Sequence, residues 1–280
     1  MASSLSMGRI QQPASRRRIG YLGPGGSWTH QACLELFGTE KLIPLEGVHL
    51  FAAFANGEIE QACVPVTTSV VGVTPYLDPV LDLSAVTVVA EYPRMLGYSL
   101  LARPGSKLED IKKVVAHPVA LEEVKPWLDR ELPHARRVTA IGGGAAARSV
   151  AECKLHDTAS MGPLIGAEIY GLISLANNIE EGPHNVTRWW VLGHEMPAPT
   201  GHDKTSLLIT VRDNGFSDVL GDLTTAGLKI LDIYERPSKK TLDTHRYLFE
   251  VEGHATDNIL SGLLRRNPTF RVLGSYARKY

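Results

Sequence analysis

Short apolar runs alternate along the first two thirds of the chain with segments whose apolar residues recur at helical spacing. The runs are rich in β-branched residues and predict buried strands at Ile19–Leu22, Ala62–Val66, Val86–Glu91, Ser99–Ala102, Val114–Ala116 and Thr158–Met161. The helical segments predict helices at Trp28–Phe37, Leu121–Leu132 and Ala145–Cys153. This alternation predicts α/β layers with largely parallel strand pairing.

A Pro- and Gly-rich segment, 197–203, predicts a linker to a second domain. Beyond it we expect strands at Lys204–Val211, Lys229–Glu235, Arg246–Glu252 and Val272–Tyr276, and helices at Ser217–Ala226 and Asp257–Arg266. The order βαββαβ is that of a ferredoxin-like fold. We therefore expect a disordered tail at 1–17, a first domain at 18–196 and a second at 204–280; the alternative is that the last segment extends the first domain.

Composition and charge narrow the class of protein. The chain has 280 residues, 44% of them hydrophobic and 21% charged, with a formal net charge of −1. This balance gives no electrostatic reason to expect nucleic acid or a membrane surface as partner. No apolar run approaches the roughly 18 residues of a membrane span, and three scattered cysteines favour a reduced cytoplasmic protein.

The first predicted strand ends in a glycine-rich turn, Gly23 to Gly26, and a helix follows with Ser27 or Thr29 as its N-cap. Free amides and the helix dipole predict an anion site there, with a plain tight turn as the alternative. In α/β sheets ligands bind at the carboxyl ends of strands. We therefore expect the chemistry at 23–29, 66–72, 141–145 and the approach to Trp189.

Other patterns argue against cofactors. His30, His117 and His184 are too widely spaced to predict a metal site. The run 142–144 does not form the G-x-G-x-x-G fingerprint with an acid some twenty residues later, so no dinucleotide site is expected.

Ordered motifs carry a resemblance to a known family. The segment 23–32 resembles the opening G-P-E-G-T-F-S-H-Q-A of prephenate dehydratases, and 64–69 resembles their V-P-I-E-N-S. Similar matches are 116–121 to S-H-P-x-A-L, 167–172 to A-A-x-x-Y-G-L and 185–189 to N-x-T-R-F. Beyond the linker, 204–206, 234–237, 252–254 and 273–276 resemble the ACT domain of the same family.

The resemblance implies a fold and an activity. Family members have two α/β lobes with the site in the cleft between them, similar to a type II periplasmic binding protein. They convert prephenate to phenylpyruvate with loss of water and carbon dioxide, without metal or organic cofactor. Their ACT domain binds phenylalanine at subunit contacts, and the usual assembly is a homodimer or homotetramer.

The resemblance also implies roles for individual residues. Thr187 would bind the ring hydroxyl, and Arg188 would hold a carboxylate in bidentate fashion. Trp189 would exclude water and pack on the ring. The remaining substrate-binding residues implied are Gly25, Gly26, Ser27 and Thr29 as an anion cradle, Thr68 and Ser69 on the opposite wall, and Gly143 and Gly144 in the carboxylate-binding turn.

The departures from the motifs fall mainly in the predicted cleft. The family's Glu-Asn pair is Thr67-Thr68, the Glu of its first motif is Gly25, and its Ser-Thr-Ala turn is 142–144, all glycine. We interpret this as changed chemistry: non-aromatising decarboxylation of prephenate to a dihydro-4-hydroxyphenylpyruvate. The alternatives are an ordinary dehydratase with compensating residues, drift in a redundant copy, and a non-catalytic keto-acid or amino-acid sensor.

The effector motifs of the ACT domain also depart from the family pattern. The family's G-A-L loop is replaced by Asn214, Gly215 and Phe216, and its E-S-R-P by Tyr234, Glu235, Arg236 and Pro237. The rings of Phe216 and Tyr234 would fill the space that phenylalanine occupies. This predicts weak or absent phenylalanine inhibition, with the domain kept for dimerisation.

Overall fold

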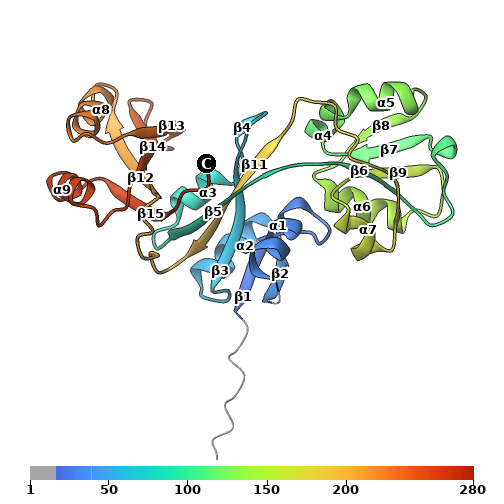
Figure 1. Cartoon of the computed structure of the whole chain (residues 1–280), viewed down its shortest axis with the longest axis horizontal. Helices are drawn as coiled ribbons and strands as arrows, with labels where there is room; N and C mark the ends of the chain where they lie inside the picture. Colours follow the sequence, from blue (N-terminus) through green and yellow to red (C-terminus); the bar gives the residue numbers. More distant parts are fainter. Residues whose placement is uncertain (1–16, 39) are drawn as a thin grey trace, which may run out of the picture.

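A computed structural model describes residues 17–38 and 40–280, which form three sheets with flanking helices (Figure 1). The predicted tail lies outside the described residues, Arg17 excepted. In the described part of the chain no helix has the length and apolar character needed to cross a membrane.

The first sheet has the strand order β2-β1-β3-β11-β5, and β4 pairs with β3. Its strands are β1 (Arg18–Leu22), β2 (Lys41–Leu45), β3 (Gln61–Thr68), β4 (Gly72–Val73), β5 (Thr87–Met95) and β11 (Val186–Gly193). Its helices are α1 (Trp28–Phe37), α2 (Gly47–Ala55) and α3 (Leu77–Asp82). We call this unit the first lobe.

The second lobe has the strand order β10-β6-β9-β7-β8. Its strands are β6 (Ser99–Ala102), β7 (Lys113–Ala116), β8 (Arg136–Thr139), β9 (Thr158–Gly162) and β10 (Ile173–Asn177). Its helices are η1 (Leu108–Asp110), α4 (Pro118–Glu123), α5 (Lys125–Glu131), α6 (Gly143–Glu152) and α7 (Ile165–Tyr170). The chain enters this lobe after β5 and returns to the first lobe at β11, so two crossing segments join the lobes (Figure 1).

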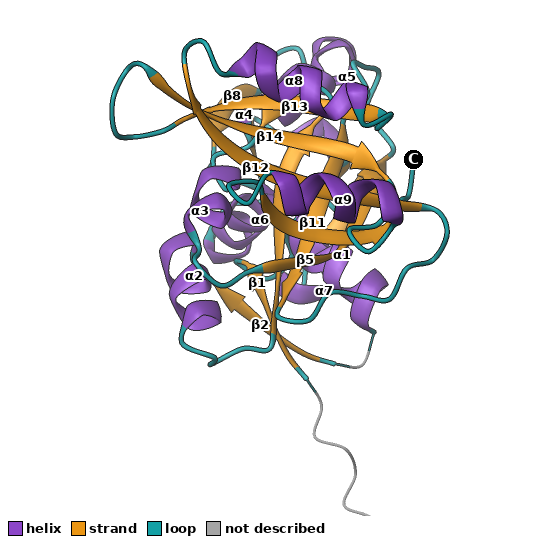
Figure 2. Cartoon of the chain, turned by 90° about the vertical axis from the view of Figure 1, so that its left-hand side faces the viewer, coloured by secondary structure: helices purple, strands orange, loops and turns teal. Residues whose placement is uncertain are grey.

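The C-terminal domain has the order β13-β14-β12-β15, and every strand pair is antiparallel. Its elements are β12 (Asp203–Arg212), α8 (Phe216–Thr225), β13 (Ile230–Pro237), β14 (Thr244–Glu252), α9 (Asn258–Arg266) and β15 (Arg271–Ala277). Figures 1 and 2 show α8 and α9 on the outer face of this sheet. The order βαββαβ with this strand arrangement is the ferredoxin-like pattern expected from the sequence.

The other face of the C-terminal sheet packs on the first lobe. Leu208, Leu248, Leu273 and Tyr276 share one buried apolar cluster with Trp190 and other residues of the first sheet. Gly274 lies so close to β5 that a Cβ atom there would be 2.1 Å from the Val88 carbonyl oxygen. Only glycine permits this approach, so the two domains are closely packed.

Two sequence predictions need correction. Strand pairing is mixed rather than largely parallel, because β11 returns antiparallel to β3 and β5, and β6 is antiparallel to β9 and β10. The helix predicted at Leu121–Leu132 is two helices, α4 and α5, separated at Val124. Pro126 stands at the start of α5, where its missing N–H is tolerated, whereas it would interrupt one continuous helix.

Candidate active site

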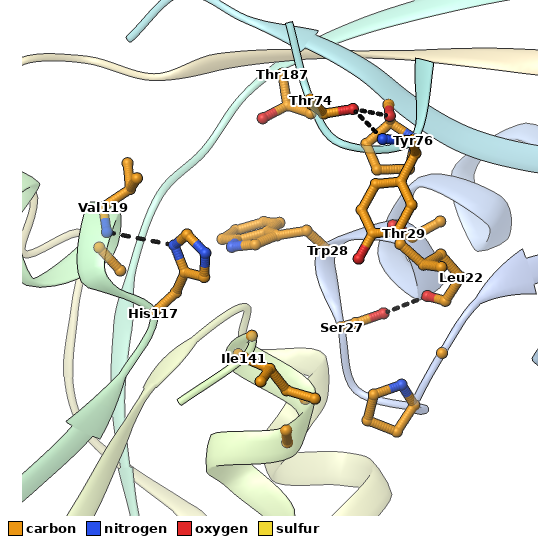
Figure 3. A pocket seen from close by; sticks show the side chains of 18 of the residues that line it. Leu22, Ser27, Trp28, Thr29, Thr74, Tyr76, His117, Val119, Ile141 and Thr187 are labelled. Atoms are coloured by element: carbon orange, nitrogen blue, oxygen red, sulfur yellow. Dashed lines mark hydrogen bonds between the residues drawn. The ribbon is translucent and has the colours of Figure 1, made fainter. Parts of the chain in front are cut away.

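A cavity of about 970 Å³ lies between the two lobes and takes its walls from both. The first lobe contributes the turn after β1, the start of α1 and the ends of β3 and β11; the second contributes the starts of α4 and α6. Figure 3 shows Trp28 of the first lobe and His117 of the second reaching into this space. A cleft between lobes, lined by apolar walls with a few polar groups, is the usual form of a small-molecule site.

The structure places most of the residues predicted to bind substrate around this cavity. The predicted residues that line the cavity are Gly25, Ser27, Thr29, Thr68, Gly143, Gly144, Thr187 and Trp189. Three predicted residues do not line it: Gly26, Ser69 and Arg188.

The start of α1 is fixed by its own side chains. The Ser27 hydroxyl caps the helix by accepting a hydrogen bond from the His30 amide at 3.2 Å. The Gly26 amide donates to Nδ1 of His30 at 3.1 Å, and Gly26 packs against Tyr170 with φ of +72°. The amide of Gly26 is therefore occupied, and the predicted anion cradle is smaller than expected.

The two lobes touch directly beside this turn. The Tyr170 hydroxyl donates to the Gly25 carbonyl oxygen at 2.9 Å, which links α7 of the second lobe to the first. A Cβ atom at Gly144 would lie 2.7 Å from the same carbonyl oxygen. The glycines at the start of α6 thus permit the lobes to approach closely around the cavity.

Strand β11 presents alternate residues to opposite faces of its sheet, as a pleated strand must. Thr187 and Trp189 line the cavity, and the Trp189 indole N–H donates to the Thr29 hydroxyl at 3.1 Å. Arg188 faces the C-terminal domain instead. Its Nη1 donates to the Glu250 carboxylate at 2.6 and 2.8 Å, and its Nε donates to the Thr67 hydroxyl at 3.1 Å. The prediction that Arg188 holds a substrate carboxylate is therefore not supported by its position.

The neighbouring threonines of β3 lie on opposite faces of the sheet, because side chains alternate along a strand and directly paired residues share a face. Thr67 pairs with Arg188 and Thr68 with Thr187, but the next pair joins Pro65 to Trp189, so Val66 is an extra residue. Thr67 consequently lies beside Arg188, and Thr68 lies on the cavity wall. Ser69 accepts from the Val186 amide at 2.8 Å and donates to the His184 carbonyl oxygen at 3.2 Å, so it ties two loops together.

The cavity lining includes polar residues of the second lobe and the crossing segments that the sequence prediction did not name. Nδ1 of His117 accepts a hydrogen bond from the Val119 amide at 3.3 Å, which leaves Nε2 as the protonated nitrogen of the neutral ring. Burial lowers the pKa of His117, which favours that neutral form. Tyr98 and Asn185 also line the cavity. The match of 116–121 to S-H-P-x-A-L is the sequence signal at this position, but it does not show that His117 faces the cavity.

Charged groups are few in the lining. Among the described residues around the cavity, Glu46 is the one carboxylate and Arg148 the one arginine or lysine, and both are exposed at its rim. The described chain contains no cluster of three or more potential metal ligands. The cavity can therefore bind an anion through helix amides and Arg148, and an apolar ring through Trp28 and Trp189.

The predicted effector residues are placed by local contacts in the C-terminal domain. The Phe216 ring packs on Tyr247, with centroids 4.6 Å apart, and Tyr234 packs at the edge of the interdomain cluster. Glu235 contacts His245, and both ends of the Arg236 guanidinium bind the Asp78 carboxylate of α3 at 2.8 Å. Asn214 and Gly215 form the turn before α8. Arg236 thus connects the domains.

Fold and cavity together define a two-lobed α/β protein with a cavity of small-molecule size between its lobes and a ferredoxin-like domain after them. A family model described as prephenate dehydratase matches residues 19–197. The chain belongs to the prephenate dehydratase family.

Named relatives extend this similarity to nearly the whole chain. A bifunctional chorismate mutase/prephenate dehydratase of Neisseria gonorrhoeae is 34% identical over 276 residues, covering 92% of this chain and 74% of the relative. The crystal structure of a prephenate dehydratase from Arthrobacter aurescens in complex with L-Phe is 31% identical, with a TM-score of 0.84, and the match covers 93% and 90% of the two chains. A structure described as GqqA, a novel type of quorum quenching acylase, has a TM-score of 0.85 at 24% identity over 94% and 98%, which shows the shared fold alone.

Proposed function

We propose that this chain is a cofactor-independent lyase that removes the ring carboxylate of prephenate and leaves the ring hydroxyl in place. The observation that carries the proposal is the scarcity of acids around the cavity: Glu46 at the rim is the one carboxylate in the described lining. Expulsion of hydroxide is assisted by a proton donor placed beside it. At the position of the family's first Glu the cavity wall has Gly25.

Helix α6 offers a site for one substrate carboxylate. Its first intrahelical hydrogen bond runs from the Ala146 amide to the Gly142 carbonyl oxygen, so the amides of Gly143 to Ala145 have no intrahelical acceptor. These amides and the positive end of the helix dipole favour an anion. Arg148, one turn further along the same helix, adds a positive charge at the rim. In this proposal Arg148 replaces Arg188 as the carboxylate-binding arginine.

The first lobe would hold the ring. Trp189 packs beside Thr29 and presents an apolar surface, and Thr187 on the same face of β11 offers a hydroxyl to the ring hydroxyl of the substrate. Cleavage of the bond between C1 and the carboxylate carbon releases carbon dioxide and sends its electron pair into the diene. A ring carbon then takes up one proton, which balances the charge of the lost carboxylate. The apolar wall around Trp189 favours this loss of charge.

Ordinary dehydration is the second candidate, and two observations favour it. Thr187 is retained in the cavity, and the relatives that match most of this chain are named prephenate dehydratases. In addition, Thr67 lies beside Arg188 rather than in the cavity, so the loss of the family's Glu at this position does not change the cleft itself. The case for decarboxylation depends on Gly25, Thr68 and the glycines at 142–144.

Incubation of the purified chain with prephenate separates the two reactions. Decarboxylation alone releases carbon dioxide and gives a product with vinyl protons and no aromatic protons in the NMR spectrum. Dehydration releases carbon dioxide and gives phenylpyruvate. A chain that binds prephenate without turnover would instead be a sensor.

The role of the C-terminal domain is also a proposal. We infer that it is an ACT domain that mediates dimer or tetramer formation and responds weakly to phenylalanine. Phe216 supports this inference, because its ring packs on Tyr247 and Phe249 within the domain. Light scattering would give the assembly, and calorimetry with phenylalanine would measure the response.

A further inference from the structure

A second cavity, of about 410 Å³, lies between α3 of the first lobe and the sheet of the C-terminal domain. Its lining consists of Leu81, Asp82, Leu208, Thr210, Ser238, Lys240, Arg246, Thr269 and Arg271. Figure 1 shows α3 of the first lobe beside the C-terminal sheet. None of these residues lines the cavity between the lobes.

Positive charge exceeds negative charge around this second cavity. Asp78 is bound by Arg236, and Asp82 is bound by Arg246 at 2.5 Å and by Lys239 at 2.9 Å. No carboxylate within the described residues forms a salt bridge with Lys240 or Arg271, both of which line the cavity. Lys240 is exposed and Arg271 is partly buried, and because partly buried charges are usually paired, this excess of positive charge favours an anion beside Arg271.

Arg246 and Arg271, the two arginines of the lining, are not fully neutralised by carboxylates. Arg246 is buried, and its Nη2 has no hydrogen-bond acceptor in the described chain; Oδ1 of Asp78 is 3.8 Å from it. Arg271 donates to backbone carbonyl oxygens at the end of α3, including that of Leu81 at 3.1 Å. Burial lowers the pKa of Arg271, as expected for a cation without a carboxylate partner.

We propose that this second cavity binds a phosphate group, either as the free ion or as a small phosphate monoester. Guanidinium groups bind tetrahedral oxyanions with parallel hydrogen bonds, and a lysine adds a mobile positive charge. Thr210 and Thr269 supply hydroxyl groups on the same wall. The bound anion bridges the end of α3 and the C-terminal sheet, so it stabilises the domain interface. This site is independent of the reaction in the cleft.

The test uses the full chain, with inorganic phosphate and glycerol 3-phosphate as probes and sodium chloride to hold ionic strength constant. Calorimetry and thermal denaturation should show saturable binding and a raised Tm for at least one probe, because a ligand of the folded state stabilises it. The two probes distinguish the free ion from the monoester. Lys240→Gln and Arg271→Gln should each raise the Kd about tenfold.

Lys229→Gln is the matched control, since it removes one positive charge from the same domain outside the cavity. It should change the Kd less than twofold. Lys240 is exposed, so its replacement keeps the test valid even where Arg271→Gln destabilises the interface. Absence of saturable binding of either probe, or equal effects of Lys229→Gln and Lys240→Gln, would overturn the proposal and show only diffuse electrostatic attraction.

Discussion

The Nη1 atom of Arg188 lies 2.6 Å from a carboxylate oxygen of Glu250, and this buried ion pair joins strand β11 of the first lobe to strand β14 of the C-terminal domain. Lys204 and Glu91 complete the cluster, with Lys204 Nζ 3.1 Å from Glu91 and 3.4 Å from Glu250. The backbone amide of Lys279 also donates a hydrogen bond to the Glu91 carboxylate, at 3.0 Å. Arg188, the neighbour of Thr187 in the chain, is therefore held in place by the C-terminal domain.

Removal of one member of this cluster should destabilise the fold. Glu250→Gln leaves Arg188 and Lys204 with one carboxylate between them, which we expect to lower the free energy of unfolding by about 3–5 kcal/mol. Arg188→Met should have an effect of similar size. Chemical denaturation measures both. Arg130→Gln, which breaks an exposed ion pair with Glu181, should cost less than about 1 kcal/mol.

The same Arg188→Met variant distinguishes a structural role from a substrate-binding role. We expect its KM for prephenate to stay within about threefold of the parent at a temperature where it is folded, because the side chain faces away from the cavity. A sharply raised KM at unchanged stability would mean that Arg188 contacts the substrate after all. Arg148→Gln should raise KM about tenfold, the effect of one lost charged contact.

Thr187→Val tests the hydroxyl on the cavity wall. The substitution keeps the shape of the side chain and removes its hydrogen-bonding group, so kcat/KM should fall about tenfold or more. Thr187→Ser, which keeps the hydroxyl, should retain most of the activity. Equal activity of the valine and serine variants would remove Thr187 from the mechanism.

The two glycines at the start of α6 should respond differently to the same substitution. Gly144→Ala places a Cβ atom 2.7 Å from the Gly25 carbonyl oxygen and 3.0 Å from the Ser27 amide, so it should push the lobes apart and lower kcat/KM more than about tenfold. A Cβ atom at Gly142 meets nothing within 4 Å, and Gly142→Ala should be close to the parent. If both variants keep full activity, close approach of the lobes is not needed for turnover.

Glu123 gives a pH dependence of stability. Burial raises the pKa of this carboxyl from 4.5 to about 7, and neither of its oxygens has a hydrogen-bond partner among the described residues. The folded chain thus holds the proton more tightly than the unfolded chain does. Its contribution to stability is present below pH 4.5 and is lost as the pH rises to about 7.

Glu123→Gln should therefore raise the free energy of unfolding by about 1–3 kcal/mol at pH 8 and change it little at pH 4.5. Glu122→Gln, on the exposed face of the same helix, is the control and should show no such pH dependence. Equal stability of the Glu123→Gln variant and the parent across this pH range would contradict the burial argument.

Local patterns in the sequence predicted most elements, because strands such as Ser99–Ala102 and helices such as Trp28–Phe37 are marked by apolar periodicity and capping residues. The side on which Arg188 lies could not be predicted. Strand alternation puts Thr187 and Arg188 on opposite faces, but which of them faces the cavity depends on packing, including the Glu250 carboxylate that a separate domain brings to the far face of the sheet. A motif alone does not show which face of the strand each of its residues occupies.

The lining of the cavity between the lobes also could not be predicted completely from local sequence. The turn at 23–26 contributes to the cavity lining, but the Gly26 amide, which the sequence offered to an anion, donates to Nδ1 of His30 four residues later. Arg148 carries no motif of its own, and its place at the rim follows from the packing of α6 against the first lobe. Such long-range placement depends on tertiary packing rather than on local sequence.

The proton NMR spectrum of the product formed from prephenate separates decarboxylation from dehydration in a single measurement. We predict carbon dioxide release in step with vinyl signals from a hydroxyl-bearing, non-aromatic ring. Aromatic signals of phenylpyruvate, growing at the rate of carbon dioxide release, would rule out non-aromatising decarboxylation and identify the chain as a dehydratase.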